Sequence, residues 1–193
     1  MPIILASSSP RRLELAGRVG LSVVVVPPEI DEDALPPLPP DELVSELSRR
    51  KASQVAGQVA AQDIVIAADT VVVLDGLILG KPEDEEDARR MLSLLSGRTH
   101  EVYTGLTVAR GGEYVTVHEV TKVTFRTLTG GEIDAYIRTG EPFDKAGAYG
   151  IQDMGALLVE GVSGDYFNVM GLPLCRLYQT LGRFGVNLLG GPL

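Results

Sequence analysis

Apolar runs and helical stripes alternate through the first third of the chain. A short apolar run covers residues 3–6, and apolar positions then recur at helical spacing until Gly20, a suitable C-cap. Residues 22–26 predict a second strand, and a Pro-rich, acidic loop follows at 27–40. A second helical stripe predicts a long helix over about residues 41–61. The first stripe consists of Leu13, Ala16 and Val19, and the second of Val44, Leu47, Val55 and Val59.

The same alternation continues through the rest of the chain. Residues 64–68 form an apolar run typical of a buried strand, and the pattern continues through a turn into a return strand at 77–79. Two β-rich runs, 99–110 and 114–125, predict a long hairpin. The other expected elements are a helix from Pro82 to about Gly97, a helix over 132–138, a Gly-rich loop over 141–150, two short strands around 161–164, and a final helix with Leu174, Leu177, Tyr178 and Leu181 on one face. Because strands and helices alternate, we expect an α/β fold with an elongated mixed β-sheet and flanking helices.

Length and composition indicate a globular chain. The 193 residues are about 1.3 times a typical domain, which predicts a single domain over residues 1–193 with two lobes. A hydrophobic share of 45% and a charged share of 22% are ordinary for soluble proteins. The apolar runs are too short to span a bilayer and the N-terminus lacks a basic signal segment, so we expect a cytoplasmic protein without a membrane partner. A single cysteine, Cys175, excludes an internal disulfide, and its apolar helix predicts that it is buried.

The charge balance narrows the ligands that the protein can bind. Lys and Arg number 17 and Asp and Glu number 26, so the formal net charge is −9. Nucleic-acid duplexes are bound by basic surfaces, which argues against a nucleic-acid polymer as partner. A small anion can still bind, provided that the few cations converge on one site, usually together with a metal ion.

A serine-rich turn and two arginines join the first predicted strand to the first helix. Pro10 fits the first turn of a helix, so the hydroxyls of residues 7–9 and the free backbone N–H groups would lie at its positive end. Arg11 and Arg12 oppose the helix dipole there, which indicates an anionic partner such as a phosphate. The alternative is an ordinary Ser-Pro N-cap with solvated arginines. A Walker A loop is excluded, because GxxxxGK[ST] is absent.

Asp69 and Thr70 follow directly on the apolar run 64–68. A carboxylate at the C-terminal end of a buried strand is a common ligand contact, so Asp69 can bind a metal or act as a general base. The alternative is an ordinary turn aspartate. Lys81 lies one hairpin further along in a Gly-Lys-Pro segment, where it either reaches a phosphate or is a solvated lysine before a helix.

Lys51 interrupts the apolar stripe of the long helix, so its ammonium either extends to the helix edge or faces a polar site. The acidic residues of the Pro-rich loop can supply a second metal ligand, and magnesium suits them because it takes oxygen ligands and binds phosphates with few carboxylates. They are Glu29, Asp31, Glu32 and Asp33. We interpret His100 and His118 as structural, since no metal-ligand pattern joins them. Gln152 lies beside the Gly-rich loop, a type of segment that often contacts ligands.

These segments, in this order, resemble the Maf family of nucleotide pyrophosphatases. The matching segments are Leu5 to Arg12, Ala68 to Thr70, Gly80 to Pro82, Ser96 to His100 and Asp144 to Gln152. The resemblance extends over nearly the whole chain, from Ile3 to about Gly185. It implies a Maf/Ham1 (inosine triphosphatase-like) architecture with a central cleft, a homodimer, and hydrolysis of a nucleoside triphosphate to the monophosphate and diphosphate. It also implies a divalent metal cation, Mg²⁺ or Mn²⁺.

The resemblance further implies roles for single residues. Asp69 would be the catalytic base that activates water, and Glu32 would help it to hold the metal. The phosphate-binding residues would be Ser8, Arg12, Lys51 and Lys81, and those tied to substrate choice would be Arg11, Thr70 and Gln152. The Gly-Ile-Gln form that ends at Gln152 is similar to the branch acting on dTTP, UTP and modified uridine triphosphates. A Gln amide donates and accepts at once, as the edge of an oxo-pyrimidine requires.

Two other functions compete with this hypothesis. One is a pyrophosphatase for 7-methyl-GTP or non-canonical purine triphosphates, a branch that departs from the Gln152 loop. The other is a non-catalytic nucleotide-binding regulator of septum formation. Asp69 and Lys81 favour catalysis over a role in binding alone.

Overall fold

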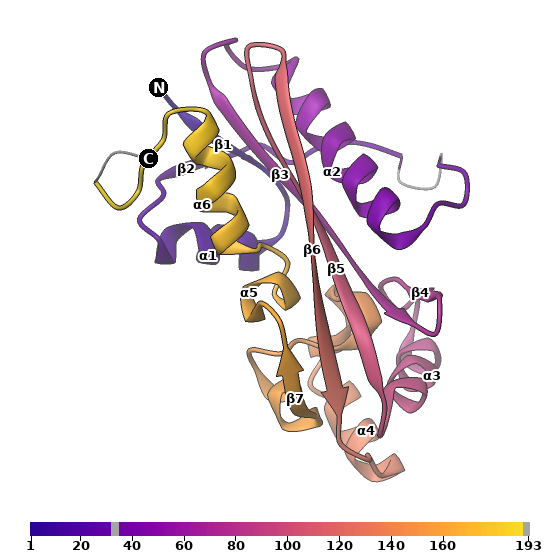
Figure 1. Ribbon diagram of the computed structural model, residues 1–193. Helices are drawn as coiled ribbons and strands as arrows, with labels where there is room; N and C mark the ends of the chain where they lie inside the picture. Colours follow the sequence, from indigo (N-terminus) through magenta and orange to yellow (C-terminus); the bar gives the residue numbers. More distant parts are fainter. Residues whose placement is uncertain (32–34, 191–193) are drawn as a thin grey trace. The chain divides into compact units, whose positions relative to one another are not determined.

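The computed structural model describes residues 1–31 and 35–190 (Figure 1). Its strands are β1 (Ile3–Ala6), β2 (Val23–Val25), β3 (Ile64–Leu74), β4 (Leu77–Leu79), β5 (Thr99–Arg110), β6 (Glu113–Phe125) and β7 (Val159–Ser163). Its helices are α1 (Pro10–Arg18), α2 (Pro40–Ala56), α3 (Glu85–Leu95), α4 (Gly130–Ile137), α5 (Tyr166–Val169) and α6 (Leu174–Arg183). Short 3-10 turns are η1 (Glu141–Asp144), η2 (Ala146–Ala148) and η3 (Met154–Leu158). None of the helices in the described part of the chain has the length and apolar character needed to cross a bilayer.

The strands form a mixed sheet of seven strands. The order is β2-β1-β3-β5-β6-β7, and β4 pairs with β3 outside this path. β1 is parallel to both of its neighbours, with Ile3 opposite Val23 of β2 and Ile64 of β3. β4 and β7 run antiparallel to β3 and β6. Parallel and antiparallel pairs, together with the helices between the strands, confirm the predicted α/β class with a mixed sheet and flanking helices.

The chain divides into two compact units. The first comprises Met1–Asp69, Thr104–Glu119 and Gly171–Leu193, and the second comprises Thr70–Tyr103 and Val120–Met170. The long strands β3, β5 and β6 each continue from one unit into the other, because the limits of the units fall within them.

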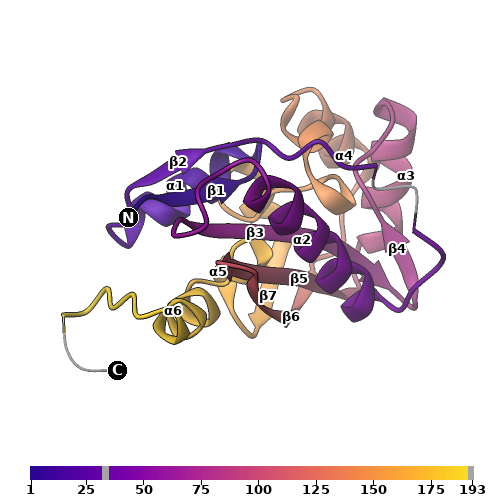
Figure 2. The same cartoon turned by 90° about the horizontal axis from the view of Figure 1, so that it is seen from above.

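In the first unit α2 packs on the strands through a core in which four of the seven buried residues that the structure describes are alanines; Figure 2 shows the helix from above. The buried members of this core are Ile4, Ala6, Ala52, Val55, Val65, Ala67 and Ala109. A Cβ at Gly105 would overlap the Val44 carbonyl oxygen, so α2 and β5 touch at the level of the backbone. The hydroxyls of Ser48 and Thr107 lie 2.9 Å apart in a buried hydrogen bond. These contacts fix the rotation of α2 and therefore the direction of the side chains on its inner face.

The second unit contains a buried aromatic cluster. The rings of His100, Phe125 and Tyr149 pack edge to face, with centroids between 4.7 and 5.4 Å apart. His100 Nε2 and the Tyr149 hydroxyl lie 2.8 Å apart. Nearby in sequence, the Gly147 N–H donates to the Gly80 carbonyl oxygen at 2.9 Å. The Gly-rich loop is thereby tied to the segment that leads into Lys81.

The buried faces of the first and last helices differ from the prediction. In α1, Leu15 and Ala16 are buried, whereas Leu13 is 44% exposed. In α6, Leu177 and Leu181 are buried as expected, but Cys175 is exposed, so the prediction of a buried cysteine is wrong. The reason is the same in both helices. Positions two residues apart differ by about 200° around a helix, so Leu13 and Cys175 lie opposite a buried neighbour.

Two further differences from the prediction concern the end of α2 and the strands near Gly161. α2 ends at Ala56, five residues before the expected limit at 61, because Gly57 and the turn between Ala60 and Asp63 close it. Near Gly161 the described chain contains one strand, β7, in place of the two short strands predicted there. After β7 the chain turns at Gly164, whose φ of 128° is unfavourable for other residues.

Candidate functional site

Lys51 of α2 and Asp69 of β3 form a buried ion pair in the first unit. Lys51 Nζ donates to Asp69 Oδ1 at 2.5 Å, and both side chains are 10% exposed. Lys51 lies beside Ala52 on the apolar face of α2, so burial of that face brings its ammonium to the sheet. The sequence left open whether Lys51 extends to the helix edge or faces a polar partner, and the partner is Asp69.

Asp69 lies in the middle of β3 and does not end a strand. β3 has 11 residues, and the strand continues beyond Asp69 through Leu74. The prediction that Asp69 closes a buried strand is therefore wrong, and so is the alternative that it is an ordinary turn residue. A buried carboxylate with one lysine partner costs free energy to desolvate, and such groups often serve chemistry. The pair can accept a proton or a metal ion at the carboxylate and attract an anion through the ammonium.

The serine-rich turn between β1 and α1 is held together by Ser7 and Arg12. The Ser7 hydroxyl, which is buried, accepts from the Ser9 N–H at 3.1 Å and from an Arg12 terminal nitrogen at 3.4 Å. Arg12 Nε also donates to the Gly171 carbonyl oxygen at 2.8 Å. Ser9 occupies the N-cap without a hydrogen bond from its side chain, and Pro10 follows at the first helical position. The turn is thus neither an ordinary serine cap nor a pair of solvated arginines.

The start of α1 has the features predicted for an anion-binding site. Its first turn holds no acidic residue, although acidic residues are favoured there. Ser8 is exposed, and Arg11 is half-buried and has an interaction of its own. The helix N-terminus, the Ser8 hydroxyl and the arginines together provide positive potential and hydrogen-bond donors.

The other predicted site residues lie in the second unit. Thr70 is adjacent to Asp69 along β3, and Lys81 is exposed after β4. Gln152 is half-buried in the loop between η2 and η3. Among the predicted site residues, Lys51 and Asp69 are in direct contact.

One predicted metal ligand, Glu32, lies outside the described residues. Within residues 1–31 and 35–190, no three His, Cys, Asp or Glu side chains group closely enough to hold a metal by themselves. Of the two predicted metal ligands, Asp69 is described, and its carboxylate offers the oxygen donors that Mg²⁺ takes.

His100, predicted to be structural, is buried against Phe125 and Tyr149. Burial lowers the pKa of His100 from its usual 6.5 to about 4, so the ring is neutral at physiological pH. Sequence reasoning did not single out Tyr136 or Glu141, which both bond to the backbone around Gln152. Their partners are more than ten residues away in the sequence, so no local spacing signals them.

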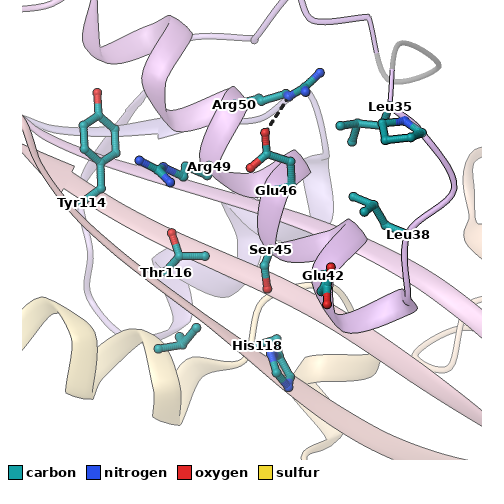
Figure 3. Close-up of a pocket in the computed structure, with 12 residues that line it drawn as sticks. Leu35, Leu38, Glu42, Ser45, Glu46, Arg49, Arg50, Tyr114, Thr116 and His118 are labelled. Atoms are coloured by element: carbon teal, nitrogen blue, oxygen red, sulfur yellow. Dashed lines mark hydrogen bonds and ion pairs between the residues drawn. The ribbon is translucent and has the colours of Figure 1, made fainter.

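A separate groove lies between α2 and β6, with a volume of about 790 Å³ (Figure 3). Glu46 and Arg50 form an ion pair on its wall at 2.8 Å, and the guanidinium of Arg49 stands 6.0 Å from the centre of the Tyr114 ring. The lining residues are Leu35, Pro36, Leu38, Glu42, Ser45, Glu46, Arg49, Arg50, Tyr114, Thr116, Val117 and His118. They include none of the predicted site residues, so this groove is distinct from the Lys51–Asp69 pair.

Comparison with known proteins supports the resemblance seen in the motifs. A family model described as Maf-like protein matches residues 2–184. The chain is 53% identical over 191 residues to a protein of Moorella thermoacetica named dTTP/UTP pyrophosphatase, covering 97% of both chains. It is 51% identical over 189 residues to a protein of the same name from Symbiobacterium thermophilum, covering 98% of this chain and 97% of the relative.

Two solved structures are also similar at a lower level. The Ham1 protein of Staphylococcus aureus matches with a TM-score of 0.48 and 14% identity, over 65% of this chain and 72% of that one. A nucleoside-triphosphatase, dITP/XTP pyrophosphatase, of Mycobacterium abscessus matches with a TM-score of 0.45 and 19% identity, over 65% and 74% of the two chains. Family membership does not depend on these two. The match over residues 2–184 and the full-length relatives establish that the chain belongs to the Maf family.

Proposed function

We propose that the protein hydrolyses dTTP and UTP, and modified uridine triphosphates, to the nucleoside monophosphate and diphosphate. The relatives named dTTP/UTP pyrophosphatase support this substrate class, since they share about half of their residues with this chain over nearly its full length. The observation that carries the proposal is the buried Lys51–Asp69 ion pair. It combines a proton acceptor with a cation in one place, as attack of water on a phosphate requires.

In the proposed reaction, a water molecule attacks the α-phosphorus of the substrate. The bond between the α-phosphorus and the bridging oxygen to the β-phosphorus breaks, and its electron pair leaves with the diphosphate. Asp69 accepts the proton that the water loses, and Lys51 lies within 2.5 Å of that carboxylate. Its ammonium also offsets the negative charge that develops on the phosphate oxygens.

Ser8, Arg12, Lys51 and Lys81 are the proposed phosphate-binding residues. The exposure of Ser8 and Lys81 supports this role, because both side chains can meet a ligand. The bonds of Arg12 to Ser7 and Gly171 are compatible with it as well, since a guanidinium carries five N–H donors. These bonds also restrict the guanidinium, which lowers the entropy lost on binding.

Arg11, Thr70 and Gln152 are the proposed residues of substrate choice. In the described part of the chain the Gln152 amide has no hydrogen-bond partner, although the residue is half-buried. A half-buried amide with both a donor and an acceptor to satisfy suits the N3–H and carbonyl edge of uracil or thymine.

A divalent cation, Mg²⁺ or Mn²⁺, is proposed as cofactor. The oxygen donors of Asp69 fit such an ion, and Glu32 is the second proposed ligand. When bound, the metal would polarise the phosphate and neutralise part of its charge. We further propose a homodimer, which the family resemblance implies, and a cytoplasmic location, where the proposed substrates are made and used.

A substrate panel tests the proposed function. Release of diphosphate is measured with dTTP, UTP, CTP, ATP, GTP, ITP and 7-methyl-GTP, each with Mg²⁺ or Mn²⁺, and the nucleotide product is identified. Fast conversion of dTTP and UTP to the monophosphate supports the proposal. Preference for a purine contradicts the substrate class and retains the chemistry. Binding without release contradicts catalysis and favours a nucleotide-binding regulator.

A further inference from the structure

Gln152 lies in a short loop whose two ends are bonded to the same pair of side chains. On the N-terminal side, the Gly150 N–H donates to the Tyr136 hydroxyl at 3.0 Å. On the C-terminal side, the Met154 N–H donates to Glu141 Oε2 at 3.1 Å and the Gly155 N–H donates to Glu141 Oε1 at 3.2 Å. The backbone is therefore held two residues before Gln152 and two and three residues after it.

Tyr136 and Glu141 are also bonded to each other. The Tyr136 hydroxyl donates to Glu141 Oε1 at 2.8 Å and accepts from Gly150, so its proton and one lone pair are both used. Burial raises the pKa of Tyr136 well above its ordinary value, and the hydroxyl keeps its proton. The two side chains form one unit, which we call the Tyr136–Glu141 clamp.

The loop fits the clamp closely because glycine stands at both of its ends. A Cβ on Gly155 would overlap the Gly150 carbonyl oxygen and approach the Tyr136 hydroxyl. A Cβ on Gly150 would press on the side chain of Lys145, whose ammonium donates to the Glu141 carbonyl oxygen at 2.7 Å. The two ends of the loop thus meet at van der Waals distance. A side chain held between such ends has little freedom to shift relative to a ligand.

The helix that carries Tyr136 is itself anchored. At the start of α4, Thr129 and Glu132 form a capping box, in which each side chain bonds to the backbone of the other. Further along the helix, Asp134 forms an ion pair with Arg89 of α3. Tyr136 is 5% exposed, so its ring is packed into the second unit and its hydroxyl is a fixed point.

We propose that Tyr136 and Glu141 are positioning residues for substrate choice, which act by holding the Gln152 amide where it meets the edge of a uracil or thymine base. This inference rests on the proposed function, since it takes Gln152 as the residue that contacts the base. The clamp bonds to the loop that carries Gln152, and none of these hydrogen bonds goes to a proposed phosphate-binding residue. We therefore expect it to affect the preference among nucleobases and to leave the shared triphosphate chemistry unchanged.

The inference is tested by the preference for UTP over CTP, measured as the ratio of kcat/KM for the two nucleotides. The two nucleotides share ring size, ribose and triphosphate, and differ in the hydrogen-bonding edge that an amide reads. In Tyr136→Phe the clamp loses the bond to Gly150 and the bond to Glu141, and in Glu141→Gln one acceptor oxygen becomes a donor. We expect kcat/KM for UTP to fall about three- to tenfold in each variant, the amount that one or two weakened hydrogen bonds produce. We expect kcat/KM for CTP to stay unchanged.

The control variants separate positioning from loss of fold. Tyr178→Phe removes a different tyrosine hydroxyl bond, to Asn187 after α6, and should leave the preference intact. In Gln152→Ala the preference should already be lost, and adding Tyr136→Phe should reduce it no further, because both act through one contact. If thermal melting shows that Tyr136→Phe does not fold, the inference is tested with Glu141→Gln by the same kcat/KM measurements with UTP and CTP.

Either of two results with the clamp variants would overturn the inference. One is an unchanged UTP preference in both clamp variants. The other is an equal loss with UTP and CTP, which would indicate damage to the fold alone. If the unmodified chain shows no preference for UTP, or Gln152→Ala leaves it intact, the assigned role of Gln152 fails, and the inference fails with it. If only the inference about Tyr136 and Glu141 is wrong, the unmodified chain still prefers UTP and Gln152→Ala still loses that preference. The two failures can therefore be told apart.

Discussion

Lys51 Nζ and Asp69 Oδ1 lie 2.5 Å apart, although the two residues are 18 positions apart in the sequence. The contact joins the apolar face of α2 to the centre of β3, next to a core that contains Ala52 of the helix and Ala67 of the strand. Both side chains are only 10% exposed, so the Asp69 carboxylate depends on the Lys51 ammonium for its stability.

Replacement of Lys51 by methionine should destabilise the protein. The carboxylate of Asp69 would remain buried without its cation, which costs about 3 kcal/mol or more in the free energy of unfolding. The measurement is chemical denaturation at neutral pH. Arg50→Met is the matched control, because Arg50 and its partner Glu46 are nearly 40% exposed and such pairs contribute about 0.5 kcal/mol.

A double-mutant cycle extends this test. If the pair interacts as the distance indicates, Asp69→Asn should cost less stability in the Lys51→Met background than in the unmodified chain, by about 1 kcal/mol or more. Strictly additive effects would show that the two charges do not depend on each other.

Gly105 should be intolerant of even the smallest side chain. In Gly105→Ala the new methyl group would overlap the Val44 carbonyl oxygen, so α2 would have to move away from β5. We expect a loss of about 3 kcal/mol in the free energy of unfolding, together with reduced turnover because Lys51 moves with the helix. Gly161→Ala in β7 is the control, since a Cβ there meets no atom within 4 Å. Equal melting temperatures for the two variants would refute the close approach.

Stability should fall as the pH decreases from about 6.5 to about 4. Burial lowers the pKa of His100 to about 4, whereas its usual value is 6.5, so between these values the unfolded chain binds a proton that the folded chain does not. The stabilisation is complete above pH 6.5 and is lost once the pH has passed below 4, a difference on the order of 3 kcal/mol. In His100→Phe, unfolding free energies at pH 7 and pH 4.5 should differ by less than in the parent.

His118 provides the matched control for the pH experiment. It is the other histidine of the chain and is exposed, so His118→Phe makes the same substitution outside the buried aromatic cluster. A parent chain whose stability is flat over this range would contradict the buried, neutral His100.

Local patterns in the sequence account for much of the fold. The return strand at 77–79 and the hairpin strand at 99–110 have the predicted bounds, because turn residues and strand periodicity mark both ends. The stripe of α2 also predicts its buried face, and the break at Lys51 is a sign of its polar partner. The exposed Cys175 shows the limit of such reasoning, because the apolar composition of a helix does not say which face is buried.

Contacts between distant segments could not be predicted in the same way. No periodicity connects Lys51 to Asp69, or Tyr136 to Gly150, since each contact depends on how helices and strands pack in three dimensions. The motifs indicated which residue types carry the chemistry, whereas the partners that hold them, such as Gly171 for Arg12, follow only from the fold.

The most direct test of the account compares diphosphate release from UTP by the unmodified chain and by Asp69→Asn, with UTP binding measured in parallel by calorimetry. Asp63→Asn, the same substitution in the turn before β3, is the control. If Asp69 accepts the proton from water, the Asp69→Asn rate falls by about 100-fold or more while UTP still binds and the control stays active. A near-normal rate in Asp69→Asn would contradict the assignment of Asp69 as the catalytic base.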